Sequence, residues 1–271
     1  MTGDSPLGKQ SAYPDEYSPE LLFSISRSEN RVTLGLGDEL PFQGVDIWNA
    51  WELSWLTNSG QPSVATLEIR VPADSPRIIE SKSLKLYLNS FSMSRYDAAE
   101  DVRSTIAADL SRCVEAGIEL SLLETAADDE LCCETLPGDC IDDLYVECRA
   151  WHVDASLLEA DADEIVSESL HSHLLRSLCP VTSQPDSGTV LITYEGPRID
   201  QPSLLRYIAS FRQHQDFHEV CVERMFLDIK DRCEPTKLTV YARYQRRGGI
   251  DINPFRSDFE TDVPNTRLWR Q

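Results

Sequence analysis

The sequence predicts an α+β fold made of two copies of one unit, in which antiparallel strands are backed by a pair of helices. Three observations support this prediction. Segments in which apolar and polar residues alternate, as in half-buried strands, stand beside segments with apolar residues three and four positions apart, as in amphipathic helices. The order strand, strand, helix, helix, strand, strand occurs in both halves of the 271 residues. No apolar run approaches the roughly 20 residues that a membrane helix needs, so no membrane partner is expected.

In the first half, residues 64–72 alternate as a strand and bring Leu67, Ile69 and Val71 to one face. Two amphipathic helices are expected next. Their apolar faces consist of Leu84, Tyr87, Leu88 and Phe91 in the first helix and of Val102, Ile106, Leu110 and Cys113 in the second. Strands over 117–124 and 144–153 complete the predicted unit.

In the second half, residues 171–180 and 189–196 are predicted to be strands. Pro202 favours a helix start, because its fixed φ suits the first helical turn. The apolar faces of the two expected helices consist of Leu204, Leu205, Ile208 and Phe211 and of Val222, Met225, Phe226 and Ile229. A last strand is expected over 237–247, where apolar and polar residues alternate again.

The two halves are expected to meet near residues 155–162, which gives one half over 1–157 and another over 158–271. Residues 124–164 contain fourteen acidic residues and one basic residue. Such a run generally faces water, so we expect a solvated hairpin and linker there, with an acidic docking surface as the alternative. Open sheet edges are generally paired or covered, and this favours a homodimer.

The charge balance excludes one class of partner. Lys plus Arg number 25 against 46 Asp plus Glu, a formal net charge of −21. This charge opposes the phosphate contacts with which polynucleotide binding begins, so direct binding to a polynucleotide is not expected. A small anionic cofactor remains compatible, because a local cluster of Lys and Arg sets the field inside one cleft.

The N-terminal residues carry an acid and early prolines where a secretory signal needs a basic start and an apolar stretch, so a cytoplasmic protein with reduced thiols is expected. Three of the eight cysteines, Cys132, Cys133 and Cys140, are close in sequence. Their spacing lacks the paired CxxC arrangement of structural zinc sites. We therefore predict no metal site and ordinary thiols beside a loop.

Four stretches carry residues suited to chemistry: 80–91, 177–186, 217–219 and 246–254. Glu80 begins the first, where a carboxylate also serves as an ordinary helix cap. Cys179 follows a predicted strand and precedes Pro180. A buried thiol is the usual fate of a cysteine, but a strand end before a proline-bounded loop favours an accessible sulfur, with Asp186 as a nearby acid.

Taken alone, each of the last two stretches has both a functional and an ordinary structural interpretation. His218 and Glu219 are adjacent, so on a helix their side chains point in different directions and each is able to face solvent. Gly248 and Gly249 permit close backbone approach to a ligand, and they also suit an ordinary turn after a strand.

Taken together, these stretches give the sequence a resemblance to one family. The matching motifs are PLGKQSAY, YSPELLF, WNAWELSWL, ESKSLKLYLNSF, SLCPVTSQPD, FHEVCVERMFLDI and VYARYQRRGGIDINPFRS. They resemble the long form of the QueF-type 7-cyano-7-deazaguanine reductases of queuosine biosynthesis, which belong to the tunnel-fold superfamily alongside GTP cyclohydrolase I. The resemblance implies a tandem tunnel fold and NADPH-dependent reduction of a deazapurine nitrile to an aminomethyl group.

The resemblance also implies residue roles. Cys179 is the expected nucleophile, Asp186 the expected proton donor and His218 a helper in later proton transfers. The substrate-binding residues implied are Ile79, Glu80, Ser81, His218 and Glu219. The NADPH-binding residues implied are Ser81, Lys82, Arg247 and Gly248.

These residue types suit the implied chemistry. A thiolate adds to a nitrile carbon and gives a thioimide, which accepts hydride more readily than the nitrile does. Two alternatives of other classes remain open at this point. One is a cysteine-dependent hydrolase or zinc cyclohydrolase on the same fold, for which His171 and His173 are the nearest further ligands. The other is a non-catalytic module that binds a purine through Glu219.

Overall fold

The computed structural model describes residue 14 and residues 16–37, 39–124 and 133–271. The PLGKQSAY motif and Cys132 lie outside these residues. The chain divides into two compact units. Unit 1 consists of 1–38, 46–132 and 246–251, and unit 2 of 39–45, 133–245 and 252–271. The predicted halves, 1–157 and 158–271, stay a prediction about the repeat. The units differ from them because 133–157 packs with the second half and the short segment 246–251 with the first.

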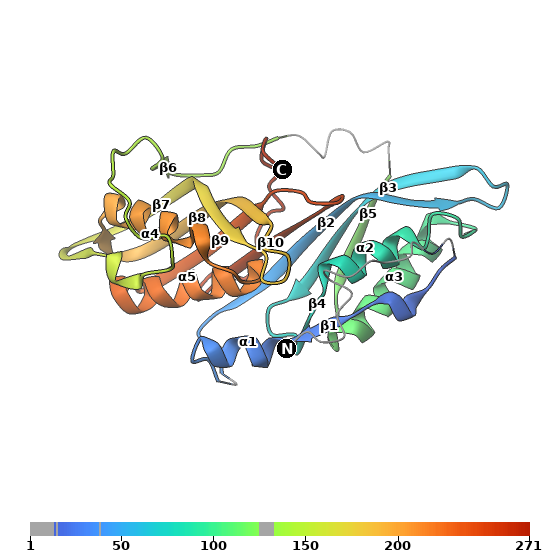
Figure 1. Ribbon diagram of the computed structural model, residues 1–271, viewed down its shortest axis with the longest axis horizontal. Coiled ribbons are helices and arrows are strands. Elements are labelled where there is room, and N and C mark those ends of the chain that lie inside the picture. The colour runs from blue at the N-terminus through green and yellow to red at the C-terminus, as the bar shows by residue number, and fades with distance from the viewer. Residues whose placement is uncertain (1–13, 15, 38, 125–132) are drawn as a thin grey trace. The chain divides into compact units, whose positions relative to one another are not determined.

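Unit 1 contains the first sheet and its helix pair. Its elements are η1 (Pro19–Leu21), β1 (Ser24–Ser26), α1 (Arg27–Thr33), most of β2 (Gln43–Leu56), β3 (Pro62–Pro72), β4 (Arg77–Ile79), α2 (Ser81–Asn89), α3 (Ala99–Val114) and β5 (Glu119–Glu124). The order of the larger strands is β5-β3-β2, and β3 and β5 are antiparallel with Leu67 opposite Leu122. Helices α2 and α3 lie side by side against this sheet (Figure 1).

The core of unit 1 follows the predicted periodicities. The strand residues Leu67, Ile69 and Val71 are buried, as the alternation predicts. On the helices, the predicted apolar faces are buried except for Cys113, which is half-buried. Alternate strand residues and every third or fourth helix residue therefore meet in one layer between sheet and helices.

A buried carboxylate joins the helices of unit 1. The hydroxyl groups of Tyr17 and Tyr87 each donate a hydrogen bond of 2.6 Å to Oδ2 of Asp109, and Arg112 pairs with the same carboxylate. Burial and this carboxylate raise the pKa of both tyrosines far above the ordinary value. The hydroxyls therefore stay protonated and remain donors over the whole physiological range.

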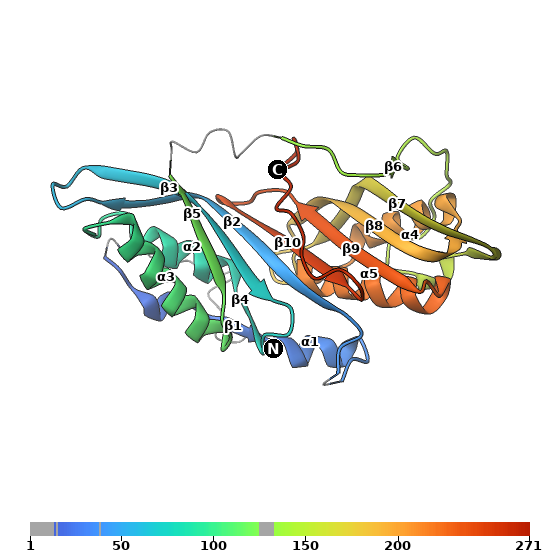
Figure 2. The same ribbon diagram turned by 180° about the vertical axis from the view of Figure 1, so that it is seen from behind.

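Unit 2 has the predicted order of elements. They are β6 (Asp139–Cys140), η3 (Ala155–Leu157), β7 (Ala160–Leu178), β8 (Pro185–Ile199), α4 (Gln201–Ser210), η4 (Phe211–Gln213), α5 (His218–Cys233), β9 (Lys237–Tyr244) and β10 (Ile250–Ser257). The strand order is β10-β9-β8-β7-β6, antiparallel except for β6 and β7. Figure 2, seen from behind, shows α4 and α5 on one face of this sheet. The α+β class with antiparallel strands and helix pairs is thus confirmed.

Two strand predictions need correction. Residues 144–153 form no strand: none of the described strands pairs with them, and Tyr145 is fully exposed. Strand β7 begins at Ala160 rather than at His171. Its acidic first part is exposed and lacks apolar alternation, yet Ala160 pairs with Ile199. Pairing with a long neighbour, and not hydrophobicity, therefore extends this strand. None of the described helices is long and apolar enough to cross a membrane.

Candidate active site

Cys179 lies at the mouth of a tight hairpin. Strand β7 ends at Leu178, β8 begins at Pro185, and six residues connect them. The loop is closed by the Cys179 N–H, which donates to the Gln184 carbonyl at 2.9 Å, and by the Ser183 N–H, which donates to the Cys179 carbonyl at 3.0 Å. The thiol-bearing residue is 9% exposed. Its backbone is therefore fixed, and Cys179 is largely buried rather than accessible as its place before a proline-bounded loop favours.

The same strand end positions the start of helix α5. The Leu178 N–H donates to the His214 carbonyl at 2.8 Å, and the Asp216 N–H donates to the Leu178 carbonyl at 3.1 Å. This short parallel bridge holds the segment before α5 against the residue that precedes Cys179. Helix α5 begins at His218, two residues after Asp216. Its first turn is therefore positioned by Leu178, the residue before Cys179.

An imidazole and a carboxylate form the centre of this region. His218 Nε2 lies 3.3 Å from Oδ2 of Asp186, and both side chains are largely buried. Asp186 stands opposite Ser177 in the β7–β8 pairing, so its position is set by the sheet. On its other side, the His218 ring stacks on Tyr244, the last residue of β9, with ring centroids 3.8 Å apart. The imidazole is thus held between a carboxylate and an aromatic ring.

Two further residues of α5 face inwards. Glu219 is 3% exposed and lies in the first helical turn, where the helix dipole stabilises negative charge. Two residues later, the thiol of Cys221 lies beside Ser177 and Tyr244, and burial raises its pKa well above that of a free thiol. Cys221 is therefore a protonated core residue, and Cys179 is the more accessible thiol of the pair.

In unit 1, the structure realises the capping role of Glu80. Its carboxylate accepts hydrogen bonds of 2.8 Å from the backbone N–H groups of Lys82 and Ser83 at the start of α2. Burial raises the pKa of this carboxyl despite the two donors. Ile79 is buried beside it and ends β4, whereas Ser81 and Lys82 are partly exposed. The 79–82 segment therefore presents the start of a helix, with its N–H groups and a lysine.

Residues 246–249, here called the RRGG segment, lie in unit 1 close to helix α2. Gly248 has φ of +59°, and a Cβ atom at this position would lie 3.3 Å from Cδ and Cε of Lys85. Arg246 places its guanidinium over the Trp51 ring, 4.9 Å from the centroid. The structure thus brings the glycine turn, Arg247 and the lysine-bearing helix α2 to one part of unit 1.

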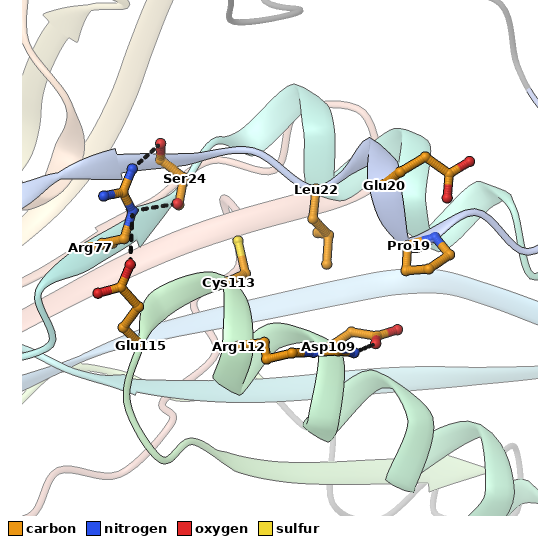
Figure 3. Close-up of a pocket in the computed structure, with 9 residues that line it drawn as sticks. All are labelled: Pro19, Glu20, Leu22, Ser24, Arg77, Asp109, Arg112, Cys113 and Glu115. Carbon is orange, nitrogen blue, oxygen red and sulfur yellow. Dashed lines mark hydrogen bonds and ion pairs between the residues drawn. The ribbon is translucent and has the colours of Figure 1, made fainter.

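Unit 1 also contains a surface pocket of about 660 Å³ (Figure 3). Its arginines are matched by acids: Arg112 pairs with Asp109, and Arg77 lies 3.9 Å from Glu115. Figure 3 shows Cys113 between these pairs. Since its cations are neutralised, this pocket is poorly suited to a phosphate-bearing cofactor.

Sequence reasoning named Cys179, Asp186, His218 and Glu219, and the structure places all four in unit 2. It missed Tyr244 and Ser177 as neighbours of the imidazole and the carboxylate. Tyr244 lies on the predicted apolar face of its strand and was expected only as a core residue. Its position at the strand end, beside the RRGG segment, was the available signal.

A thiol directly after one strand, a carboxylate on the strand paired with it and an imidazole at a helix start form a residue set typical of enzymes that use a cysteine nucleophile. Comparison with known proteins identifies the class. Residues 13–122 match the family described as "Nitrile reductase, 7-cyano-7-deazaguanine-reductase N-term", and residues 185–262 match the family described as "QueF-like protein". The chain belongs to the 7-cyano-7-deazaguanine reductase family.

Full-length relatives agree with this assignment. The NADPH-dependent 7-cyano-7-deazaguanine reductase of Azoarcus sp. (strain BH72) is 55% identical over 254 residues, which cover 93% of this chain and 90% of the relative. The enzyme of the same name from Paraburkholderia phymatum is 51% identical over 269 residues, 98% of each chain. Separately, the solved apo structure of the archaeosine synthase QueF-Like matches 36% of this chain and 96% of its own chain at 17% identity, and its TM-score of 0.32 adds nothing to the assignment.

Proposed function

We propose that the chain is an oxidoreductase that reduces the nitrile of 7-cyano-7-deazaguanine to an aminomethyl group in queuosine biosynthesis, with NADPH as the reductant and Cys179 as the nucleophile. The family assignment supports the reaction, and it favours a reductase over the hydrolase and the purine-binding module. The observation that carries the residue assignment is the β7–β8 hairpin, which holds Cys179 and Asp186, together with the 3.3 Å contact between Asp186 and His218.

The first step is addition of the thiolate to the nitrile. An electron pair of the Cys179 sulfur forms the S–C bond, and one π bond of the nitrile opens toward nitrogen. The nitrogen takes a proton, and the product is a neutral thioimide with no leaving group. Asp186 is the donor of this proton, and His218 shares a proton with it across the short contact.

Later steps need the same residues as proton carriers. When bound, NADPH would supply the two hydrides that separate a nitrile from an amine, one from each of two molecules bound in succession. After the carbon of the thioimide has been reduced, the C–S bond breaks and the sulfur departs as the Cys179 thiolate. The organic product of this step is an imine. Because Cys179 and Asp186 are at most 9% exposed, the site limits the access of water that would hydrolyse this imine.

Substrate recognition is assigned to Glu219. A guanine-like edge presents two adjacent N–H donors, which one carboxylate is able to accept as a bidentate pair. Glu219 is buried in the first turn of α5, next to His218, so a base bound there would place its reactive group near the imidazole. Ile79, Glu80 and Ser81 are the further residues assigned to the substrate.

The residues of unit 1 fit a phosphate-bearing cofactor. Lys82, Lys85 and Arg247 are cationic, and Gly248 lacks the side chain that would obstruct close approach of a ligand to the backbone. Ser81 adds a hydroxyl donor at the start of α2. We assign NADPH to Ser81, Lys82, Arg247 and Gly248.

The proposal also includes a cytoplasmic homodimer. A free thiolate at Cys179 needs a reducing compartment, and all seven cysteines that the structure describes are free thiols. Among the described strands of the larger sheet, β5 and β6 stand at the edges. Open sheet edges are generally paired or covered, which supports a homodimer.

The covalent step is directly testable. Enzyme mixed with 7-cyano-7-deazaguanine in the absence of NADPH should accumulate the thioimide, and intact mass spectrometry should show an increase equal to the whole substrate. Cys179→Ala should lose both the adduct and the reduction, whereas Cys133→Ala, at an exposed thiol, should keep both. A peptide map that places the adduct on another cysteine would overturn the assignment.

A further inference from the structure

A cluster of metal-ligating side chains lies in unit 2, apart from the residues assigned above. Sγ of Cys140 and one ring nitrogen each of His171 and His173 lie within 4.8 Å of one another. In the sequence, Cys140 stands close to Cys132 and Cys133, and His171 and His173 are candidate ligands beside Cys179. Neither pattern predicts that Cys140 meets the two histidines. The parallel pairing of β6 with β7, which sets Cys140 opposite His171, brings them together (Figure 1).

The histidines are oriented as metal ligands generally are. Nδ1 of His171 is hydrogen-bonded to the Pro137 carbonyl at 3.2 Å, and Nδ1 of His173 to Oγ1 of Thr189 at 2.9 Å. Such contacts from one ring nitrogen fix the ring and leave the other, Nε2, for a metal. The two rings meet edge to face with centroids 5.4 Å apart.

An irregularity of β7 sets the direction of His173. The β7–β8 register shifts between Ser172 and Leu175, so His173 and Leu174 together stand opposite Thr189. A bulge of this kind re-aims a side chain relative to a regular strand. Here it accompanies the hydrogen bond between Nδ1 of His173 and Oγ1 of Thr189.

The segment that carries Cys140 is fixed to β7 at several points. A Cβ atom on Gly138, whose φ is +76°, would lie 2.0 Å from the Ser169 carbonyl oxygen, so only glycine permits this approach. The Ile141 N–H donates to the His171 carbonyl at 3.0 Å. The Asp142 carboxylate accepts hydrogen bonds from the Ser172 hydroxyl and the His173 N–H. The thiol is therefore held beside the histidines by backbone contacts on both sides.

We propose that Cys140, His171 and His173 bind a divalent metal ion of the zinc class. One thiolate and two imidazoles are ligands that zinc prefers, and a fourth position remains for water or for the adjacent Asp142 carboxylate. Ligand atoms around a tetrahedral zinc ion lie roughly 3.3 to 3.8 Å apart, so the observed cluster needs to contract by only about 1 Å. Cys140 is exposed, which leaves an entry path for the ion.

Cobalt(II) is the probe for this site, because tetrahedral Co²⁺ absorbs in the visible range and a thiolate ligand adds a charge-transfer band in the near ultraviolet. Metal-free full-length protein titrated with Co²⁺ should take up one equivalent and develop both features, and an equivalent of Zn²⁺ should displace them. Cys140→Ser should lose the charge-transfer band, and His173→Ala should weaken Co²⁺ binding at least tenfold. Cys148→Ser, at a half-buried thiol downstream, is the matched control and should leave the titration unchanged.

Circular dichroism should confirm that each variant is folded. The inference is overturned if the parent protein binds no more Co²⁺ than a Cys140→Ser/His173→Ala double variant does. It is equally overturned if the charge-transfer band survives in Cys140→Ser. Neither result depends on reductase activity, so the test is independent of the function assigned to Cys179.

Discussion

The imidazole of His218 lies parallel to the phenol ring of Tyr244, with an angle of 5° between the planes and 3.8 Å between the centroids. Tyr244 ends strand β9 and His218 begins helix α5, so the stack joins the sheet to the helix start. It fixes the plane of the ring whose Nε2 faces Asp186. Tyr244 is thus a positioning residue for the proposed proton transfers.

Replacement of Tyr244 should separate this stacking from the effect of its hydroxyl group. Tyr244→Phe keeps the aromatic face and should retain most activity, whereas Tyr244→Leu removes it. Aromatic pairs contribute roughly 0.5–1.5 kcal/mol beyond their burial, so kcat should fall about 2- to 12-fold in Tyr244→Leu. The pH profile of kcat should shift only in the leucine variant. Identical profiles in both variants would remove Tyr244 from this role.

The Asp186–His218 pair has a close structural counterpart that serves as a control. His214 precedes His218 by four residues, and its Nε2 lies 3.5 Å from Oδ2 of Asp216. Asp186→Asn keeps the shape of the side chain but has no carboxylic proton to give, so thioimide formation should slow by about 100-fold or more, the usual range for a lost general acid. Asp216→Asn should be nearly unaffected. Stopped-flow measurement of adduct formation decides, and equal rates in the two variants would contradict the role of Asp186.

Thiol accessibility gives a third prediction. Burial raises the pKa of Cys221, so its reactive thiolate form is scarce at neutral and mildly alkaline pH. Native enzyme treated with iodoacetamide at pH 8 should be alkylated at Cys179 and at the exposed Cys133, but not at Cys221. After unfolding in guanidinium chloride, Cys221 should react as well. Peptide mass spectrometry provides the measurement, and modification of native Cys221 at the rate of Cys133 would be inconsistent with its burial.

The buried cap Glu80 predicts a pH-dependent stability. Burial raises its folded-state pKa, so the folded protein holds this proton more tightly than the unfolded chain does. The resulting contribution is fully present below the unfolded-state pKa and is lost as pH rises through the folded-state value. Glu80→Gln lacks this titration. Relative to Glu80→Gln, the parent should therefore be more stable at pH 4 than at pH 7, as measured by urea unfolding; a pH-independent difference would argue against a raised pKa.

Local patterns were sufficient to predict most of the core, because burial on one face imposes a period of two on strands and of 3.6 on helices. Leu67, Ile69, Val102 and Ile106 are buried for that reason. Residues 144–153 show the limit of this reasoning. Their apolar and polar residues alternate, but a strand also needs a partner strand, and the local sequence does not determine which segments pair. The exposed, acidic start of β7 shows the converse, since pairing with β8 makes a strand without apolar alternation.

The candidate site was predictable where its residues lie in compact motifs, as with Cys179, Asp186, His218 and Glu219. The resemblance to a family supplied their roles, which neither spacing nor composition could have supplied. The contacts that require the tertiary fold were not predictable. The stacking of Tyr244 on His218 and the meeting of Cys140 with His171 both join segments more than 25 residues apart. The first depends on how helix α5 packs on the sheet, and the second on the register of β6 and β7.

The last prediction concerns the cofactor. The extra ribose phosphate of NADPH is a dianion, and the cations of unit 1 assigned to it include Lys82 at the start of α2. A hydrogen bond to a charged group contributes roughly 1.5–3 kcal/mol, so Lys82→Ala should raise the KM for NADPH by about 10-fold or more while changing the KM for NADH much less. Lys237→Ala is the matched control, because that amine pairs with Glu195 at 2.7 Å in unit 2 and should affect neither constant.

Gly248→Ala should also raise the KM for NADPH, since a side chain at φ of +59° is strained and would contact Lys85. Steady-state kinetics with both cofactors tests all three variants. Equal kcat/KM for NADPH and NADH in the parent, or an equal loss with both cofactors in Lys82→Ala, would show that Lys82 does not recognise the ribose phosphate.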